Sequence, residues 1–285
     1  MDILSNPKVT KDIVSKHGFK FSKSLGQNFL IDNNILNKIV DSALIEEDDY
    51  VIEVGPGIGT LTREIAKRAK KVIAVEIDKT LIPILEETLA DLDNASVVNE
   101  DILKLDIKKL IDEEFEGKRV KLVANLPYYV TTPIIMRFLE EEIPLKNMVV
   151  MIQKEVGERI ESQPNKKTYG ALSVGVQFYS SVDIIGIVPK TVFIPQPKVD
   201  SIVIRLNIYE ELPYKVSDRK KFFKIVRGAF AQRRKTLLNT LSSSLSISKE
   251  EIKQLVDDEI DLKRRGETLS ISEFVKLYEL IYESK

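Results

Sequence analysis

Short apolar, β-favouring runs alternate with segments of helical spacing through the first half of the chain. The runs at residues 50–54, 71–76, 95–99, 120–125 and 147–153 predict strands. Residues 33–43, 61–69, 79–92, 107–114 and the segment after residue 132 predict helices, the first of them capped by Asp32 or Asn33. Strands that alternate with crossover helices imply a mostly parallel sheet with right-handed connections.

After residue 153 this alternation becomes less regular. Residues 154–160 and 171–179 predict two helices on either side of a polar loop. Residues 182–188 and 199–208 predict two strands that are joined by a loop with three prolines, too short for a crossover helix. We therefore expect an antiparallel pair at the sheet edge. From residue 209 the chain is helical and polar. Three parts follow: an N-terminal arm at 1–24, an α/β domain at 25–208 and a small all-helical domain at 209–285.

Composition limits the chemistry that is available to the chain. Of its 285 residues, 43% are hydrophobic and 31% are charged, which is typical of a soluble globular protein. No apolar run approaches the roughly 18 residues of a membrane span, and the N-terminus lacks an apolar signal core, so we expect a cytoplasmic protein. The chain has no cysteine and one histidine, His17, which we expect to be solvated. We expect no metal site, and any chemistry must come from a cofactor or from positioning.

The net charge of −1 hides a strongly basic segment at residues 214–240. Its candidate phosphate contacts are Lys220, Lys224, Arg227, Arg233, Arg234 and Lys235. Lys220, Lys224, Arg227 and Arg234 recur at intervals of three, four and seven, which places them on one face of a predicted helix. Such a face suits contacts with nucleic-acid phosphates, the alternative being an ordinary solvated surface.

The N-terminal arm is also basic. It carries Lys8, Lys11, Lys16, Lys20 and Lys23 among small polar residues. This composition predicts a mobile or loosely attached arm, and a plain solvated tail is the alternative.

The first predicted strand ends in a glycine turn within the sequence VIEVGPGIGTLT, residues 51–62. Gly55, Gly57 and Gly59 allow positive φ and let a ligand approach the backbone without meeting a Cβ atom. Glu53 lies just before the turn. The pattern predicts a strand, a tight turn and a helix around a bound ligand, although an ordinary βα turn would look similar.

The next two strands end in acidic residues. In open α/β sheets the ligand lies beyond the carboxyl ends of the strands. Glu76 is placed to accept hydrogen bonds from both hydroxyls of a ribose, and Asp101 from the exocyclic amine of an adenine. Ile77 and Ile102 follow these acids in the chain and complete the candidate set. These residues fit any adenosine-containing cofactor, whether a nicotinamide dinucleotide or S-adenosylmethionine.

The fourth strand ends in Asn125-Leu126-Pro127-Tyr128, which favours the methyl donor. An exocyclic amine is a poor nucleophile because its lone pair is delocalised into the ring. The side-chain oxygen of Asn125 and the carbonyl of Leu126 or Pro127 would hold both amine hydrogens and favour attack on a methyl group. Tyr128 would stack on the flipped base. A proline turn with a packing tyrosine is the alternative.

Taken together, these segments resemble a known family. LGQNFL, EVGPGIGTLT, VEID, NLPYYVTTPI, QKEVGERI and FIPQPKVDS are similar to the bacterial small-subunit (16S) ribosomal RNA adenine N6,N6-dimethyltransferases, from about Lys23 to Asn239. The resemblance implies a Rossmann-like class I methyltransferase domain at 25–208 and a helical RNA-binding domain at 209–285. It also implies an enzyme that dimethylates two adjacent adenosines in the 3′-terminal hairpin loop. The implied methyl donor is S-adenosyl-L-methionine, and the product of the donor is S-adenosyl-L-homocysteine. The expected partner is small-subunit rRNA or the pre-30S particle. The protein is expected to be a monomer and to act during maturation of the small subunit.

The same resemblance assigns roles to individual residues. The family holds the methionine and sulfonium end of the cofactor with the region that matches Asn28, Leu30 and Gly55. It holds the ribose with the acid at Glu76 and the adenine with that at Asp101, and Asn125 lies beside the reacting centre. An aromatic at the position of Phe193 lies near the target pocket, so Phe193 and Tyr128 would clamp the adenine, with Pro195 and Pro197 stiffening the loop.

Four alternatives remain open from the sequence. Within the same chemistry, the chain could methylate large-subunit rRNA, as macrolide-resistance enzymes do, or DNA adenines. It could instead act as a largely non-catalytic RNA-binding factor in ribosome assembly. A nicotinamide-dependent dehydrogenase is the alternative from another class.

Overall fold

The computed structural model describes residues 4–22, 25–256 and 258–283. The chain divides into two compact units, the first made of Met1–Gly157 with Val182–Ile208 and the second of Glu158–Ser181 with Tyr209–Lys285. Residues 158–181, which the sequence places in the α/β domain, thus group with the C-terminal helices. The domain boundaries at 24/25 and 208/209 stay a prediction about how the chain is organised.

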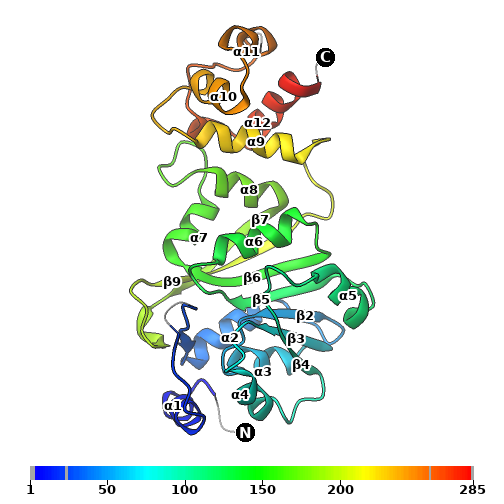
Figure 1. The fold of residues 1–285 in the computed structure, drawn as a ribbon, viewed down its shortest axis with the longest axis vertical. Coiled ribbons are helices and arrows are strands. Elements are labelled where there is room, and N and C mark those ends of the chain that lie inside the picture. The colour runs from blue at the N-terminus through cyan, green and yellow to red at the C-terminus, as the bar shows by residue number, and fades with distance from the viewer. Residues whose placement is uncertain (1–3, 23–24, 257, 284–285) are drawn as a thin grey trace. The chain divides into compact units, whose positions relative to one another are not determined.

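The first unit is built on a sheet of seven strands in the order β4-β3-β2-β5-β6-β9-β7 (Figure 1). The strands are β2 (Tyr50–Val54), β3 (Lys71–Glu76), β4 (Ala95–Asn99), β5 (Val120–Asn125), β6 (Leu145–Gln153), β7 (Ser180–Val188) and β9 (Ser201–Ile208). Strands β2 to β6 pair in parallel, and β9 runs antiparallel to β6. The predicted parallel sheet is confirmed, with β9 and β7 as neighbours at its edge.

The predictions of β2, β3, β5 and β6 succeed because these four strands are buried. All five residues of β2 and most of β5 and β6 are buried, so each strand is a nearly continuous apolar run. Val51, Val72, Val123 and Val149 from four of these strands share one hydrophobic cluster.

One helix precedes the parallel strands and four connect them. They are α2 (Asn33–Ser42), α3 (Thr60–Ala66), α4 (Ile82–Thr88), α5 (Ile107–Phe115) and α6 (Thr131–Glu140). Asp32 caps α2 by accepting from the amides of Asn34 and Ile35, as predicted. Helix α4 is shorter than residues 79–92, because Asp78 and Thr80 form a turn before it.

The N-terminal arm is structured where it is described, which corrects the expected mobile arm. Helix α1 (Pro7–Lys16) and the preceding turn bury Leu4 and Ile13 in a cluster with Phe29 and residues of α4. His17 is not fully solvated either: its ring is 21% exposed, with Nε2 2.8 Å from Glu87. The apolar side chains have helical spacing that the lysines obscure. Lys23 lies outside the described residues.

The amino end of the sheet contains a buried ion network. Asp49, which precedes β2, lies 2.6 Å from Nζ of Lys121 and 2.5 Å from Nζ of Lys146. Nζ of Lys121 also donates to the carbonyl of Leu44. Burial alone would raise the pKa of Asp49, but hydrogen bonds from the two lysines lower it below its ordinary value.

The remaining elements include one pairing that the sequence did not predict. Strands β1 (Phe29–Leu30) and β8 (Phe193–Ile194) form a short antiparallel sheet, with Leu30 opposite Phe193.

Helix α7 spans Lys154–Glu161, and the short helices are η1 (Lys190–Val192), η2 (Gly266–Thr268) and η3 (Glu279–Glu283).

The second unit is helical around an aromatic core. It contains α8 (Ala171–Tyr179), α9 (Arg219–Phe230), α10 (Leu237–Leu245), α11 (Lys249–Val256) and α12 (Ile271–Tyr278). The ring of Phe178 lies 4.9 Å from that of Phe222 and 5.6 Å from that of Tyr214, centroid to centroid. Helix α9 ends at Phe230, so Arg234 lies in the following turn and not on the predicted helix face. The chain reverses there, because Lys235 N bonds back to the Gln232 carbonyl.

Candidate active site at the carboxyl ends of the strands

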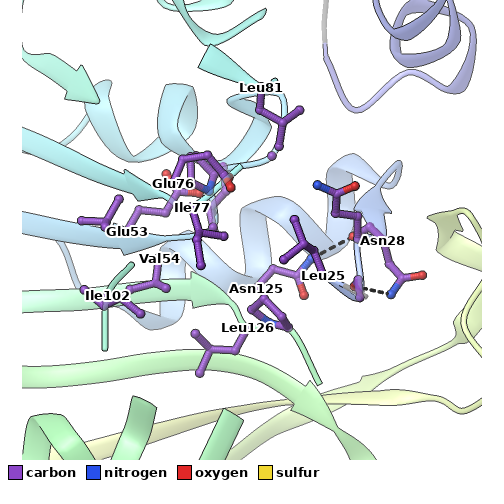
Figure 2. Close-up of a pocket in the computed structure, with 18 of the residues that line it drawn as sticks. Leu25, Asn28, Glu53, Val54, Glu76, Ile77, Leu81, Ile102, Asn125 and Leu126 are labelled. Atoms are coloured by element: carbon purple, nitrogen blue, oxygen red, sulfur yellow. Dashed lines mark hydrogen bonds between the residues drawn. The ribbon is translucent and has the colours of Figure 1, made fainter. Parts of the chain in front are cut away.

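A cavity lies beyond the carboxyl ends of β2, β3 and β5, where the strand order changes direction between β2 and β5 (Figure 2). This is the position that the topology predicts for a ligand. The predicted site residues that line it are Asn28, Leu30, Glu53, Gly55, Gly57, Glu76, Ile77, Asp101, Ile102, Asn125, Leu126, Pro127 and Tyr128. Gly59 and Phe193 were predicted with them but do not line it.

The three glycines of the turn divide into two roles. Gly55 and Gly57 border the cavity at positive φ. A Cβ atom on Gly59 would lie 3.0 Å from both Leu89 and Thr88 of the α4 segment. Gly59, with φ +85, therefore allows α3 to begin close against α4 and has a packing role.

Glu53 is a buried acid at this cavity. Its side chain is 1% exposed, and within the described part of the chain its Oε2 atom has no hydrogen-bond partner. Burial raises the pKa of Glu53 to about 8, and the nearby charge of Glu76 adds to the rise. At neutral pH the carboxyl is therefore mostly protonated.

The two acids expected to bind an adenosine lie at the ends of β3 and β4. Glu76 is 4% exposed, and its Oε1 accepts from the amide of Asp78 at 2.8 Å. Burial raises the pKa of Glu76 to about 7, helped by the charge of Asp78. Asp101 is more exposed, and its Oδ1 accepts from the amide of Leu103 at 2.9 Å.

The orientation of the Asn125 amide is fixed from the N-terminal segment. Its Nδ2 donates to the carbonyl of Asn28 at 3.1 Å, and Nδ2 of Asn28 donates to the carbonyl of Gly26 at 2.9 Å (Figure 2). Because Nδ2 of Asn125 donates its hydrogen bond to the Asn28 carbonyl, Oδ1 is the atom of this amide that remains to accept a hydrogen bond from a ligand.

The turn after Asn125 indicates which backbone carbonyl, that of Leu126 or that of Pro127, can accept the second hydrogen of the amine. The carbonyl of Pro127 accepts from the hydroxyl of Thr131 at 3.0 Å and from the amide of Val130 at 3.2 Å. Both of its lone-pair positions are therefore used within the turn. The carbonyl of Leu126 is the better second acceptor for an amine.

The two aromatic residues expected to clamp a base lie in different environments. Tyr128 is half-buried at the cavity, and its hydroxyl lies 2.7 Å from Oγ of Ser201. Phe193 is 3% exposed and packs with Leu30 and Val188 in the hydrophobic cluster under the sheet. The β1–β8 pairing holds Phe193 in this core, so the structure does not bring it to Tyr128 as the second ring of a clamp.

Several cavity residues were not predicted. Leu25, Gln27, Leu81 and Tyr129 line the wall, and Tyr129 is 56% exposed. Nε2 of Gln27 donates to Asp78 at 2.7 Å, which ties the N-terminal segment to the end of β3. Gln27 is next to Asn28 in LGQNFL, and Tyr129 is next to Tyr128, so adjacency to predicted site residues was the available signal.

The predicted phosphate contacts lie in the second unit, and one of them has another role. Lys220, Lys224 and Arg227 are exposed on α9. Arg233 donates to the carbonyls of Lys167 and Tyr169 at 2.7 and 2.9 Å and lies 3.4 Å from Glu267. Its guanidinium therefore holds the loop at residues 162–169. Arg234 and Lys235 are exposed in the turn after α9.

The described residues include neither a metal-binding cluster nor a membrane-spanning helix. Within residues 4–22, 25–256 and 258–283, no cluster of three or more His, Cys, Asp or Glu side chains is arranged to hold a metal ion. No helix in these ranges combines the length and apolar character needed to cross a membrane.

Comparisons with known proteins agree with this geometry. The family model described as ribosomal RNA adenine dimethylase matches residues 18–282. A protein of Clostridioides difficile named ribosomal RNA small subunit methyltransferase A is 56% identical over 282 residues, covering 99% of this chain and 98% of that protein. The Alkaliphilus oremlandii protein of the same name is 59% identical over 276 residues, 96% of each chain.

Solved structures give the same fold. A dimethyladenosine transferase from Plasmodium falciparum aligns with a TM-score of 0.75 at 25% identity, over 87% of this chain and 95% of that one. The 23S rRNA methyltransferase ErmE aligns with a TM-score of 0.66, also at 25% identity, over 88% and 98% of the two chains. The predicted α/β fold with a helical C-terminal region is confirmed.

Proposed function

The chain belongs to the ribosomal RNA adenine dimethylase family, and we propose that it dimethylates the N6 amines of two adjacent adenosines in the 3′-terminal hairpin loop of small-subunit (16S) rRNA. It is an enzyme that uses S-adenosyl-L-methionine as methyl donor and leaves S-adenosyl-L-homocysteine. The observation that carries the proposal is the amide of Asn125, which is fixed by the Asn28 carbonyl next to Tyr128. The relatives named for the small subunit support this choice of RNA.

The cavity fits the cofactor. Glu76 would hold the ribose hydroxyls and Asp101 the adenine amine, while Asn28, Leu30 and the Gly55–Gly57 turn would surround the methionine portion. Oε2 of Glu53 has no hydrogen-bond partner among the described residues, and this supports the fit, because a buried acceptor calls for a donor from a ligand. The amino group of the methionine portion is such a donor. When bound, the cofactor supplies a methyl group on a sulfonium, ready for transfer to a nucleophile.

The residues of the turn after β5 would prepare that nucleophile. Oδ1 of Asn125 and the carbonyl of Leu126 would accept the two hydrogens of the adenine amine and favour its pyramidal form. Tyr128 would stack on the base and keep it facing the methyl group. No general base is needed, because the amine loses its proton after transfer. The catalytic contribution of this chain is then alignment and exclusion of water.

The second unit would bind RNA through phosphate contacts. Lys220, Lys224 and Arg227 on α9, with Arg234 and Lys235 beyond it, are exposed cations, which supports a salt-dependent contact with the RNA backbone. Arg233 would act indirectly, because it holds the loop that exposes Lys166 and Lys167. We propose the pre-30S particle as partner and a role in its maturation. We also propose that the enzyme is a cytoplasmic monomer, as the family resemblance implies.

The test is methylation of small subunits purified without this modification, followed by mass mapping of the RNA fragments. Dimethylation of two adjacent adenosines in the 3′-terminal hairpin is expected. The similarity to ErmE makes large-subunit rRNA the second candidate substrate. A mass gain on large-subunit RNA alone would favour it, and no gain on either RNA would favour an RNA-binding assembly factor.

A further inference from the structure

We propose that Ser201 is a positioning residue for methyl transfer, because its hydroxyl anchors the ring of Tyr128 in the place where the ring receives the target base. The inference rests on the proposed function of Tyr128 as the stacking platform. The two hydroxyl oxygens lie 2.7 Å apart, although the residues are separated by 73 positions in the chain.

Ser201 is part of the rigid sheet. Its side chain is fully buried, and it is the first residue of β9, opposite Gln153 at the end of β6. The amide of Lys154 donates to the carbonyl of Asp200 at 3.0 Å, which continues the connection between the two strands by one residue. The backbone that carries the hydroxyl therefore has a defined position that does not depend on a bound ligand.

Tyr128, in contrast, is on a turn. Its backbone is held on both sides, by the bond from Leu126 N to the Met151 carbonyl and that from Val130 N to the Pro127 carbonyl. These bonds leave the side-chain torsions unset. The phenol oxygen lies on the axis about which the ring turns, so a hydrogen bond at this atom restricts the first side-chain torsion and fixes where the ring lies. A ring that is ordered before the base arrives loses less freedom on binding.

This arrangement gives the FIPQPKVDS segment a role that Phe193 does not fill. Phe193 is in the core, whereas the other end of the segment delivers Ser201 to the active site. Oδ1 of Asp200 accepts from the amide of Lys190 at 3.0 Å and closes the loop between them. The loop thus places a hydroxyl, and not a second ring, beside Tyr128.

A double-mutant cycle tests the inference with Ser201→Ala, Tyr128→Phe and the pair. The kcat is measured at saturating cofactor and small-subunit substrate. Quenching of 2-aminopurine, placed at the target position of a hairpin RNA, reports stacking. We expect Ser201→Ala to lower kcat about fivefold, the effect of one hydrogen bond, and to reduce quenching. S-adenosylhomocysteine affinity should not change. Tyr128→Phe should give the same losses, and the pair no further loss.

Two further variants separate positioning from simple structural support. Ser201→Thr keeps the hydroxyl and should restore quenching. Ser180→Ala removes another fully buried serine hydroxyl, which bonds the Val176 carbonyl in the second unit, and should leave kcat and quenching unchanged.

Three outcomes would overturn the inference: wild-type kcat and quenching in Ser201→Ala, losses that add in the pair, or a loss of cofactor affinity in step with kcat. If the wild-type protein itself does not methylate small-subunit RNA, the proposed function fails and not this inference alone.

Discussion

Buried carboxyl groups lie at both ends of β2, but their surroundings shift their pKa values in opposite directions. At the amino end, Asp49 is fully buried between Lys121 and Lys146, and its pKa is lowered. At the carboxyl end, Glu53 and Glu76 are buried without a cation in the described part of the chain, and their pKa values are raised. The residues Asp49 and Glu53 are only four positions apart.

The difference shows which end holds the sheet together and which end receives a ligand. A buried carboxylate is costly unless a counter-charge or hydrogen-bond donors accompany it. The protein supplies both at Asp49. At Glu53 and Glu76 the protein supplies no counter-charge from the described residues and only part of the hydrogen-bond donors. The ribose hydroxyls and the ammonium group of bound S-adenosyl-L-methionine would supply the rest. We therefore expect substitutions at the amino end to change stability and those at the carboxyl end to change activity.

The largest expected effect is at the amino end. Asp49→Ala leaves Lys121 buried without its counter-charge, so we expect the free energy of unfolding to fall by about 3–5 kcal/mol, measured by urea denaturation. Asp48→Ala, which removes an exposed acid next to it, should change stability by less than about 0.5 kcal/mol. Equal effects of the two substitutions would contradict a structural role for the ion network.

At the carboxyl end, Asn125→Ala should lower kcat by about 10²-fold or more, because the amine loses a preorganised acceptor. Affinity for S-adenosylhomocysteine, measured by calorimetry, should stay close to that of the wild type. The matched control is Asn147→Ala in β6, since Nδ2 of Asn147 donates to the Ala43 carbonyl at the amino end of the sheet. This variant should lose stability and keep its kcat. Full activity of Asn125→Ala would remove the assigned role.

The pH dependence of stability should have opposite signs at the two ends. The pKa of Glu53 is about 8 in the folded protein against an ordinary value of 4.5, so the folded state binds more protons between these pH values. Stability of the ligand-free protein should therefore fall as pH rises through this window, by about 1.4 kcal/mol per pH unit for one proton. Glu76, with a pKa of about 7, adds to the fall up to that pH.

Glu53→Gln should flatten this decline, measured as unfolding midpoints from pH 5 to 8. The lowered pKa of Asp49 acts in the other direction, because its contribution is lost on acidification below its ordinary 3.8. An unchanged slope in Glu53→Gln would show that Glu53 does not titrate in this range.

The smallest expected effect is a proton released on ligand binding. If the ammonium of the methionine portion approaches Glu53, the ionised form is favoured and up to one proton leaves near pH 7. Calorimetry of S-adenosylhomocysteine binding in two buffers of different ionisation enthalpy would detect it. Glu53→Gln should reduce the buffer dependence. Heats that do not depend on the buffer in the wild-type protein would rule out this coupling.

The strands and the cavity position could be predicted from sequence because local patterns determine them. Buried parallel strands are continuous apolar runs, and their carboxyl ends meet at one edge, which brings Glu76, Asp101 and Asn125 together. No local pattern marks Asn28 and Leu30, and they were assigned to the cofactor site only by resemblance to a family.

Sequence patterns missed contacts where distant pairings determine the structure. Phe193 is buried because it pairs with Leu30, 163 residues earlier, in a sheet only two residues long per strand. The bond between Tyr128 and Ser201 depends on the register of β9 on β6. Arg233 has the charge of a phosphate ligand, but a loop near residue 167 holds its guanidinium. No local pattern reports these contacts.

The hydrogen bonds that orient Asn125 and Tyr128 also set an order of assembly during synthesis. Asn125 is held by residue 28, which leaves the ribosome before it, whereas Tyr128 is held by residue 201, which leaves after it. A growing chain that folds from its N-terminus could therefore place its amine acceptor well before it could fix its stacking ring. The enzyme would become fully competent only when β9 has joined the sheet, late in its own translation.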